Sequence, residues 1–282
     1  MIKIISDSTC DLSPELIKKY DIEILPLNIV LDDRSVRDGV LTQAELFAWA
    51  DSNAKTPKTA AAAMEDTVEL FSKYRDCDVI VFSISGEMSS TNQVMHLAAE
   101  EAGCGKIRII DSRNLSTGIG LQVLRAADMV AEGMSFEDIC AELDAIIPRV
   151  RASFVIDTLT YLQRGGRCSP LTALAANLLS LKPKIIVKDG KMDVDRKYRG
   201  KIGRVVENYV ADLMPDLKEA DRRRVFITHT MQGDAAAIVE ATRKTLSETG
   251  LFDEILETHA GGVISSHCGP NTLGVLFISN KS

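Results

Sequence analysis

The chain has 282 residues, of which 45% are hydrophobic and 26% charged, so it is a globular protein long enough for two domains rather than a disordered chain. Its net charge of −7 and its lack of a large basic block disfavour nucleic acid as the main partner, because neutralising phosphates needs clustered Lys and Arg. No apolar stretch approaches the roughly 18 residues of a membrane span, and no signal-peptide pattern precedes the first strand, so we expect a cytoplasmic protein without a membrane span.

In the first half of the chain, short β-rich runs alternate with helical patterns. Ser13 and Pro14 are typical of a helix start, TQAE at Thr42 is a capping box, and Pro26 indicates an edge or an irregularity in its strand. The expected strands lie at 2–5, 22–31, 78–84 and 106–111. The expected helices lie at 13–20, from 42 onward, and at 65–75, 90–103, 117–132 and 135–147.

After Pro148 the pattern changes. The stretch KIIVKDGKMDVDRK predicts a β-hairpin that turns at Asp189 and Gly190, and strands are expected at 151–157, 224–229, 253–259 and 273–279. Helices are expected at 158–165, 171–179, 201–214 and 234–249, while ISSHCGPNTLG is interpreted as a tight loop. The fold class is therefore α/β, with two α/β domains. The first, 1–149, has a mostly parallel sheet, and the second, 150–282, has a mixed sheet with helices.

Small polar residues follow several of the expected strands, and ligands of open α/β sheets bind at such carboxyl ends. The most informative case is SISGEMSST, where Ser89, Ser90 and Thr91 bring hydroxyl groups to a helix N-terminus. The unpaired N–H groups and the dipole of a helix start favour an anion. Plain N-capping explains the same residues, and the two roles are compatible.

Two further stretches are candidates for a site. Thr59 precedes four alanines, which suits either a turn and helix cap or the wall of a narrow pocket. LQRGGRCSP places Arg164 and Arg167 around two glycines, where they are either solvated or in contact with a phosphate or carboxylate. The GxxxxGK[ST] spacing of a P-loop is absent, and no GxGxxG follows a strand.

Metal binding and nucleophilic catalysis have weaker support. No HExxH, no helical histidine pair and no CxxC occurs, so no metal site is expected among His96, His229, His259 and His267. Ser89, His267 and Asp7 can be drawn as a triad, but the GxSxG of a nucleophile elbow is missing. A hydrolase, or a phosphotransferase that uses His267, stays open as an alternative.

Several stretches, in this order, resemble the DegV family of bacterial proteins. They run from residue 2 to about 277, and they are specific as a set. The segments that carry the resemblance are SDSTCDLSPEL, TPKTAAAA, SISGEMSSTNQ, IIDSRNLSTGIG, YLQRGGRCSP, LKPKIIVKDG and SSHCGPNTLG. The Thr-Ser-Gln-Pro-Ser stretch of the family is here Thr59 followed by four alanines.

The resemblance implies a fatty-acid-binding protein of two α/β domains that is not itself an enzyme and has no cofactor. A long-chain, palmitate-like fatty acid is expected in a buried apolar pocket, with its carboxylate at the domain junction. The expected partner is an ATP-dependent fatty acid kinase, to which the carrier presents the fatty acid.

By position, the carboxylate-binding residues fall on Thr59, Ser89 and His267. The secondary candidates are Ser90, Thr91 and Arg167. Thr59 and Ser89 belong to loops of 1–149, whereas Arg167 in GGR and His267 in a terminal loop belong to 150–282. A binding protein for another carboxylate metabolite is the remaining alternative.

Overall fold

The computed structural model describes residues 1–166 and 181–281, and the strands in these residues form three sheets. A parallel sheet has the order β2-β1-β6-β7, a mixed sheet has the order β10-β9-β8-β13-β11-β12, and a small antiparallel sheet has the order β4-β3-β5. The expected α/β architecture, with a parallel sheet and a mixed sheet plus helices, is confirmed.

The strands have the following bounds: β1 Ile2–Asp7, β2 Ile22–Leu25, β3 Asn28–Leu31, β4 Arg34–Arg37, β5 Lys58–Ala60, β6 Asp78–Ser83, β7 Ile107–Asp111, β8 Val150–Val155, β9 Leu181–Lys188, β10 Lys191–Arg199, β11 Ala220–His229, β12 Glu254–His259 and β13 Leu273–Ser279. The helices have the following bounds: α1 Pro14–Lys19, α2 Gln43–Asn53, α3 Met64–Lys73, α4 Thr91–Ala102, α5 Thr117–Ala131, α6 Phe136–Ile146, α7 Thr160–Arg164, α8 Ile202–Leu217, α9 Ala236–Glu248 and α10 Gly262–Cys268.

Local sequence signals account for several of these boundaries. Ser13 accepts a hydrogen bond from the N–H of Leu16 at the start of α1, and Thr42 forms the predicted capping box with Glu45 at the start of α2. The hairpin β9–β10 turns at Asp189 and Gly190, both with positive φ, as a tight two-residue turn requires.

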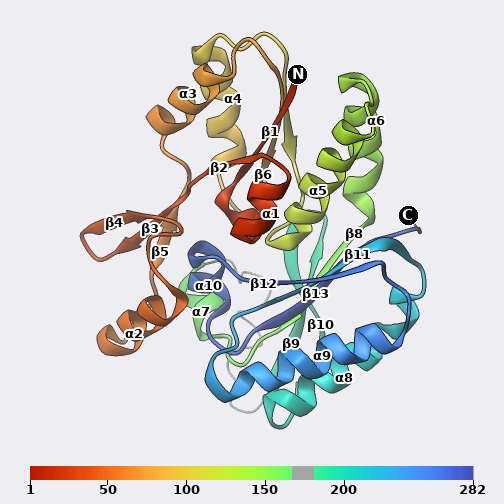
Figure 1. Cartoon of the computed structure of the whole chain (residues 1–282). Helices are drawn as coiled ribbons and strands as arrows, with labels where there is room; N and C mark the ends of the chain where they lie inside the picture. The colour runs from red at the N-terminus through yellow and green to blue at the C-terminus, as the bar shows by residue number, and fades with distance from the viewer. Residues whose placement is uncertain (167–180, 282) are drawn as a thin grey trace.

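Helix α5 lies between the parallel and mixed sheets and packs on both of them (Figure 1). It contacts β1 and β6 on one side and β8, β11 and β13 on the other, and most of its side chains are buried. A helix buried on all sides needs apolar or small residues all round, which the sequence TGIGLQVLRAADMVA largely supplies. One core cluster consequently runs through both sheets, from Ile4 to Ile278.

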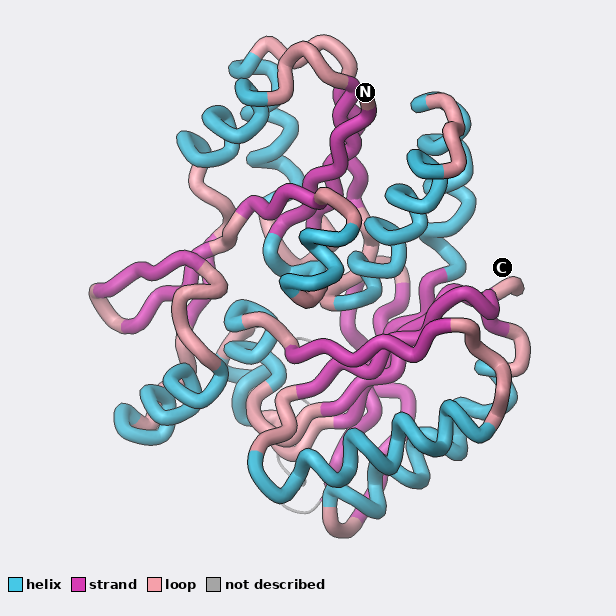
Figure 2. Tube along the Cα trace, in the orientation of Figure 1, coloured by secondary structure: helices cyan, strands magenta, loops and turns pink. Residues whose placement is uncertain are grey.

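The outer layers are helical (Figures 1 and 2). Helices α3 and α4 cover one face of the parallel sheet, whereas α8 and α9 cover the face of the mixed sheet that is turned away from α5. The small antiparallel sheet and α2 extend to one side of the molecule. Among the contacts of this side lobe with the region of α10, the Gln43 amide donates to the carbonyl oxygen of Ala260 at 2.6 Å, just before that helix.

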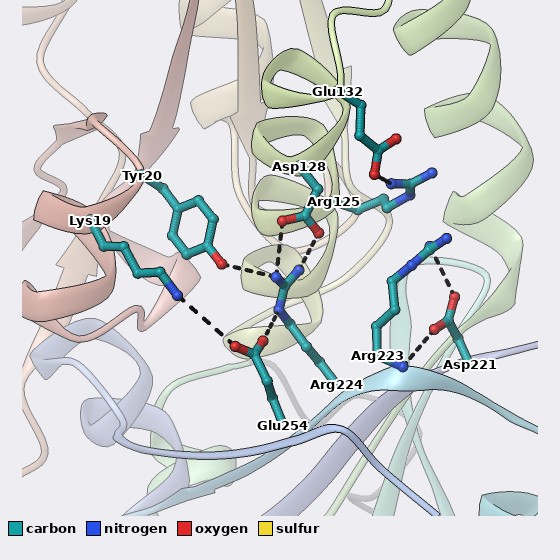
Figure 3. A network of polar contacts seen from close by, with 9 residues as sticks. All are labelled: Lys19, Tyr20, Arg125, Asp128, Glu132, Asp221, Arg223, Arg224 and Glu254. Atoms are coloured by element: carbon teal, nitrogen blue, oxygen red, sulfur yellow. Dashed lines mark hydrogen bonds and ion pairs between the residues drawn. The ribbon is translucent and has the colours of Figure 1, made fainter.

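A network around Arg224 fastens α1 and α5 to the mixed sheet (Figure 3). The guanidinium of Arg224 on β11 donates to both carboxylate oxygens of Asp128 on α5, to Glu254 on β12 and to the hydroxyl of Tyr20. The Arg224 and Asp128 side chains are only 11% and 17% exposed. This network therefore joins residues that are far apart in the sequence through largely buried charges.

Two sequence interpretations were wrong. The strand expected at 22–31 is broken at Pro26 into β2 and β3, which belong to different sheets, because proline cannot donate a ladder hydrogen bond. The region of His267, expected to be a loop, forms helix α10, which ends at Gly269 with a φ of 75°. The helix predicted at 171–179 lies outside the described residues.

Candidate functional site

Helix α10 is held by two carboxylates near its first residues. Asp11 accepts a hydrogen bond from the N–H of Gly261 at 2.8 Å, and Asp38 accepts from the N–H groups of Gly262 and Val263 at 2.9 and 3.3 Å. These bonds satisfy donors that a helix start leaves without an intrahelical partner. A β-carbon at position 262 would lie 2.9 Å from Asp38 Oδ1 and 2.5 Å from an Ile29 methyl carbon, so glycine is required for this approach.

A cavity of about 340 Å³ opens beside α10. This volume lies near the lower end of the range of roughly 300 to 1,000 Å³ that is usual for small-molecule sites. Its polar part is contributed by Thr59, Ser89, Ser90 and His267. The remaining lining residues are apolar or weakly polar and come from the small antiparallel sheet, from α10, from β10 and from loops: Leu27, Ala60, Ala61, Ile84, Met88, Leu115, Met192, Val263, Ile264 and Cys268.

Thr59 and His267 are in direct contact in this cavity. The Thr59 hydroxyl oxygen lies 2.8 Å from Nε2 of His267, although the two residues are 208 positions apart. Gly165, just after α7, lies against the other side of the ring, since a β-carbon there would fall 2.2 Å from Nδ1. The imidazole is thus fixed between β5 and the end of α7.

Ser89 and Ser90 lie at the start of α4, as predicted. Ser90 is the N-cap, but its side chain makes no capping hydrogen bond. Ser89 instead accepts a hydrogen bond from the N–H of Thr91 at 3.2 Å, and its hydroxyl lies 2.9 Å from the Thr91 hydroxyl. Thr91 is fully buried and does not line the cavity, but its two contacts with Ser89 fix the direction of the Ser89 hydroxyl. Ser89 and Ser90 line the cavity.

Buried acidic residues support the loops around the cavity. Asp7, at the end of β1, is fully buried and accepts hydrogen bonds from the N–H groups of Ile84 and Thr9. Burial raises the pKa of Asp7 to about 6, against the lowering effect of these hydrogen bonds. Burial also raises the pKa of Asp11 and of Asp38 above their usual range. These carboxylates position the main chain and do not line the cavity.

The cavity wall carries little fixed charge. Burial raises the pKa of the Cys268 thiol to about 12, so this group is neutral at physiological pH. The polar groups that the lining residues offer are therefore two serine hydroxyls, a threonine hydroxyl and an imidazole. Such a set can hydrogen-bond an anion without placing a lysine or arginine beside it.

The structure brings Thr59, Ser89, Ser90 and His267 to one cavity, while Thr91 lies behind Ser89. Arg167 lies outside the described residues. Sequence reasoning missed the roles of Asp11 and Asp38. The adjacent glycines before Val263 were a usable signal, because paired glycines permit close approach of other groups to the backbone.

Other kinds of site have less support in the described residues. Within 1–166 and 181–281, no group of three or more His, Cys, Asp or Glu side chains is arranged to hold a metal ion. The helices in the same residues include none that is long and apolar enough to cross a membrane.

Comparison with known proteins places this geometry in context. The model of a family described as uncharacterised proteins of the DegV family matches residues 1–280. A DegV domain-containing protein of Caldanaerobacter subterraneus is 34% identical over 280 residues, which covers 98% of each chain.

Two solved structures extend the comparison. A DegV family protein from Thermus thermophilus, described as binding fatty acid, is 31% identical with a TM-score of 0.90, and the match covers 99% of each chain. A stearic-acid-binding protein from Eubacterium ventriosum is 28% identical with a TM-score of 0.85, and the match covers 99% of each chain.

Proposed function

The chain belongs to the DegV family, and on that premise we propose that it binds a long-chain fatty acid with its carboxylate at Thr59, Ser89 and His267. The observation that carries the proposal is the cavity beside α10, which combines these hydroxyl and imidazole groups with an otherwise apolar wall. A fatty acid needs this combination, a dry surface for its tail and a small polar set for its head.

The apolar wall supplies most of the binding free energy. Each methylene removed from water contributes about 0.8 kcal/mol, so a palmitate-like tail contributes on the order of 10 kcal/mol before the entropic cost of binding. Met88 and Met192 add flexible, polarisable surface to the cavity wall, which suits a ligand with many conformers.

The polar end determines where the carboxylate lies. An ionised carboxylate without hydrogen bonds loses several kcal/mol on leaving water, so it must find donors. The hydroxyls of Thr59 and Ser89, together with the ring of His267, provide them in this proposal. With no fixed cation among the lining residues, the head is held loosely enough to react with a phosphoryl donor.

The test is calorimetric titration of lipid-stripped protein with palmitate. We expect saturable binding of one molecule per chain, and much weaker binding of octanoate, which buries fewer methylenes. Equal affinity for palmitate and for a short polar carboxylate such as citrate would favour a binding protein for another carboxylate metabolite. Turnover of model esters that disappears in Ser89→Ala would favour the hydrolase.

We also propose that the protein is a carrier without its own catalytic activity, which presents the fatty acid to an ATP-dependent fatty acid kinase. The support is chemical, since the groups proposed to hold the carboxylate are hydroxyls and an imidazole, and no lysine or arginine is among the lining residues to neutralise it. In a mixture of kinase, ATP and loaded carrier, we expect acyl phosphate to form only when all three are present. Acyl phosphate formation by the protein and ATP alone would contradict the carrier role.

A further inference from the structure

A second cavity, of about 490 Å³, lies on the side lobe and differs from the first in its chemistry. It is lined by Lys55, Lys58 and Arg164, by the indole of Trp49, and by Val30, Asp32, Ala54 and Thr56. Basic and aromatic side chains therefore meet in one concave site that is separate from the cavity proposed for the fatty acid.

Neighbouring residues of β5 line the two cavities. Lys58 precedes Thr59 on β5, and successive side chains of a strand point to opposite faces. Arg164 precedes Gly165, which lies against the ring of His267. Strand β5 thus presents the neutral Thr59 to the first cavity and the cation Lys58 to the second, while the end of α7 supplies Arg164 to the second.

The charge in the second cavity is unbalanced. Lys55 is paired with Asp32 at 2.7 Å, which leaves Lys58 and Arg164 as an excess of two positive charges among the lining residues. Within the described parts of the chain, neither Lys58 nor Arg164 has an ion-pair partner, and both side chains belong to exposed residues. Two uncompensated cations in a concave site of a protein with net charge −7 favour a ligand of two negative charges.

We propose that this basic cavity binds the phosphate group of a small phosphate ester. A phosphate monoester carries between one and two negative charges near neutral pH, which matches Lys58 and Arg164. The guanidinium of arginine fits two phosphate oxygens at once, and lysine adds a point charge. The cavity is larger than a phosphate ion, and the indole of Trp49 offers the organic part of the ester a flat apolar surface.

Trp49 is the only tryptophan of the chain, so its fluorescence reports on this cavity without labelling. The experiment titrates the protein with AMP, inorganic phosphate and adenosine, and follows each titration by fluorescence and by calorimetry. We expect saturable binding of AMP, weaker binding of phosphate, and none of adenosine. Binding of adenosine as tight as that of AMP, phosphate as tight as AMP, or no binding of AMP by either method would overturn the proposal.

One double variant and two controls locate the bound phosphate. The double variant Lys58→Gln/Arg164→Gln is expected to weaken AMP binding about tenfold or more, because it removes both charged hydrogen-bond donors. Lys18→Gln, a change of an exposed lysine on α1, is expected to have no effect. Thr59→Ala is also expected to leave AMP binding unchanged. If AMP binding survives the double variant, or is lost in Thr59→Ala, the phosphate does not bind in this cavity.

Discussion

At the scale of single residues, the central contact is the one between Thr59 and His267. A hydroxyl 2.8 Å from an imidazole nitrogen can donate or accept, depending on the tautomer of the ring. The pair can therefore turn a donor toward a carboxylate without needing a permanent charge. Ser89 adds a hydroxyl whose direction is fixed by Thr91.

Removal of the two hydroxyls tests this arrangement. Thr59→Ala and Ser89→Ala are each expected to weaken palmitate binding about tenfold to hundredfold, because a hydrogen bond to a charged group contributes roughly 1.5 to 3 kcal/mol. Calorimetric titration measures the effect. Ser247→Ala, which removes an exposed hydroxyl on α9, is the control and should bind like the unaltered protein. Unchanged affinity in the Thr59→Ala/Ser89→Ala double variant would mean that the head group binds elsewhere.

The raised pKa of Asp7 leads us to expect that the stability of the protein depends on pH. Its pKa is raised by burial to about 6, from an ordinary value of 3.8. Because the raised pKa means that the folded state favours the protonated carboxyl group, Asp7 contributes its full stabilisation below pH 3.8. This stabilisation is lost as the pH rises through 6 and the carboxyl group ionises. The loss amounts to about 3 kcal/mol.

Urea unfolding of the protein and of Asp7→Asn, at several pH values between 4 and 7, isolates this effect. The free energy of unfolding of the unaltered protein, relative to that of the variant, should fall across this range. A constant difference between the two proteins would show that the carboxyl group of Asp7 keeps its ordinary pKa in the folded state.

At the scale of elements, α10 and α7 together determine where His267 lies. Gly165 has a φ of −74°, which any residue can adopt, but a β-carbon there would lie 2.2 Å from Nδ1 of His267 and 3.1 Å from the carbonyl oxygen of Tyr161. The requirement is therefore one of space and not of backbone conformation.

Gly165→Ala is expected to displace the imidazole, break its contact with Thr59 and weaken palmitate binding about tenfold. Calorimetry gives the affinity, and the NMR signals of the His267 ring report its displacement. Gly105→Ala is the matched control, because a β-carbon at that position meets no atom within 4 Å. If the His267 signals and the affinity both stay unchanged in Gly165→Ala, the ring is not confined as described.

The elements that the sequence predicted well are those with a local signal. Ser13, the capping box at Thr42 and the Asp189–Gly190 turn act within a few residues, and each appears in the structure as expected. Strand β5, in contrast, has three residues and depends on pairing with β3, so no local pattern marks it.

The meeting of Thr59, Ser89 and His267 in one cavity agrees with the sequence prediction, whereas the geometry of the cavity was not predictable. The resemblance to a family pointed to Thr59, Ser89 and His267, and the structure brings all three to one cavity. Helix α10 was missed because its start is held by Asp11 and Asp38, which are more than 220 positions away in the sequence. Such long-range capping leaves no trace in the local pattern of ISSHCG.

At the scale of the whole molecule, α5 and the Arg224 network join the two large sheets. The boundary expected near residue 150 coincides with the first residue of β8, but the core cluster crosses it. The division into two domains, 1–149 and 150–282, stays a prediction.

Arg224→Met tests how much the network in Figure 3 stabilises the protein. Removing the guanidinium leaves Asp128, only 17% exposed, without its main partner, so we expect a loss of roughly 3 kcal/mol in the free energy of unfolding. The control is Lys73→Met, which breaks an exposed pair with Glu69 and should cost less than about 0.5 kcal/mol. Equal stability of the two variants in urea would mean that the network does not hold the sheets together.

The cavity beside α10 is proposed to hold a long-chain fatty acid, and mass spectrometry of the ligand that the purified protein retains is the decisive experiment. Organic extraction should release one dominant fatty acid of palmitate-like length in near-stoichiometric amount, and much less from Thr59→Ala/Ser89→Ala purified in the same way. Release of only a polar metabolite, or equal amounts of fatty acid from both proteins, would contradict the account.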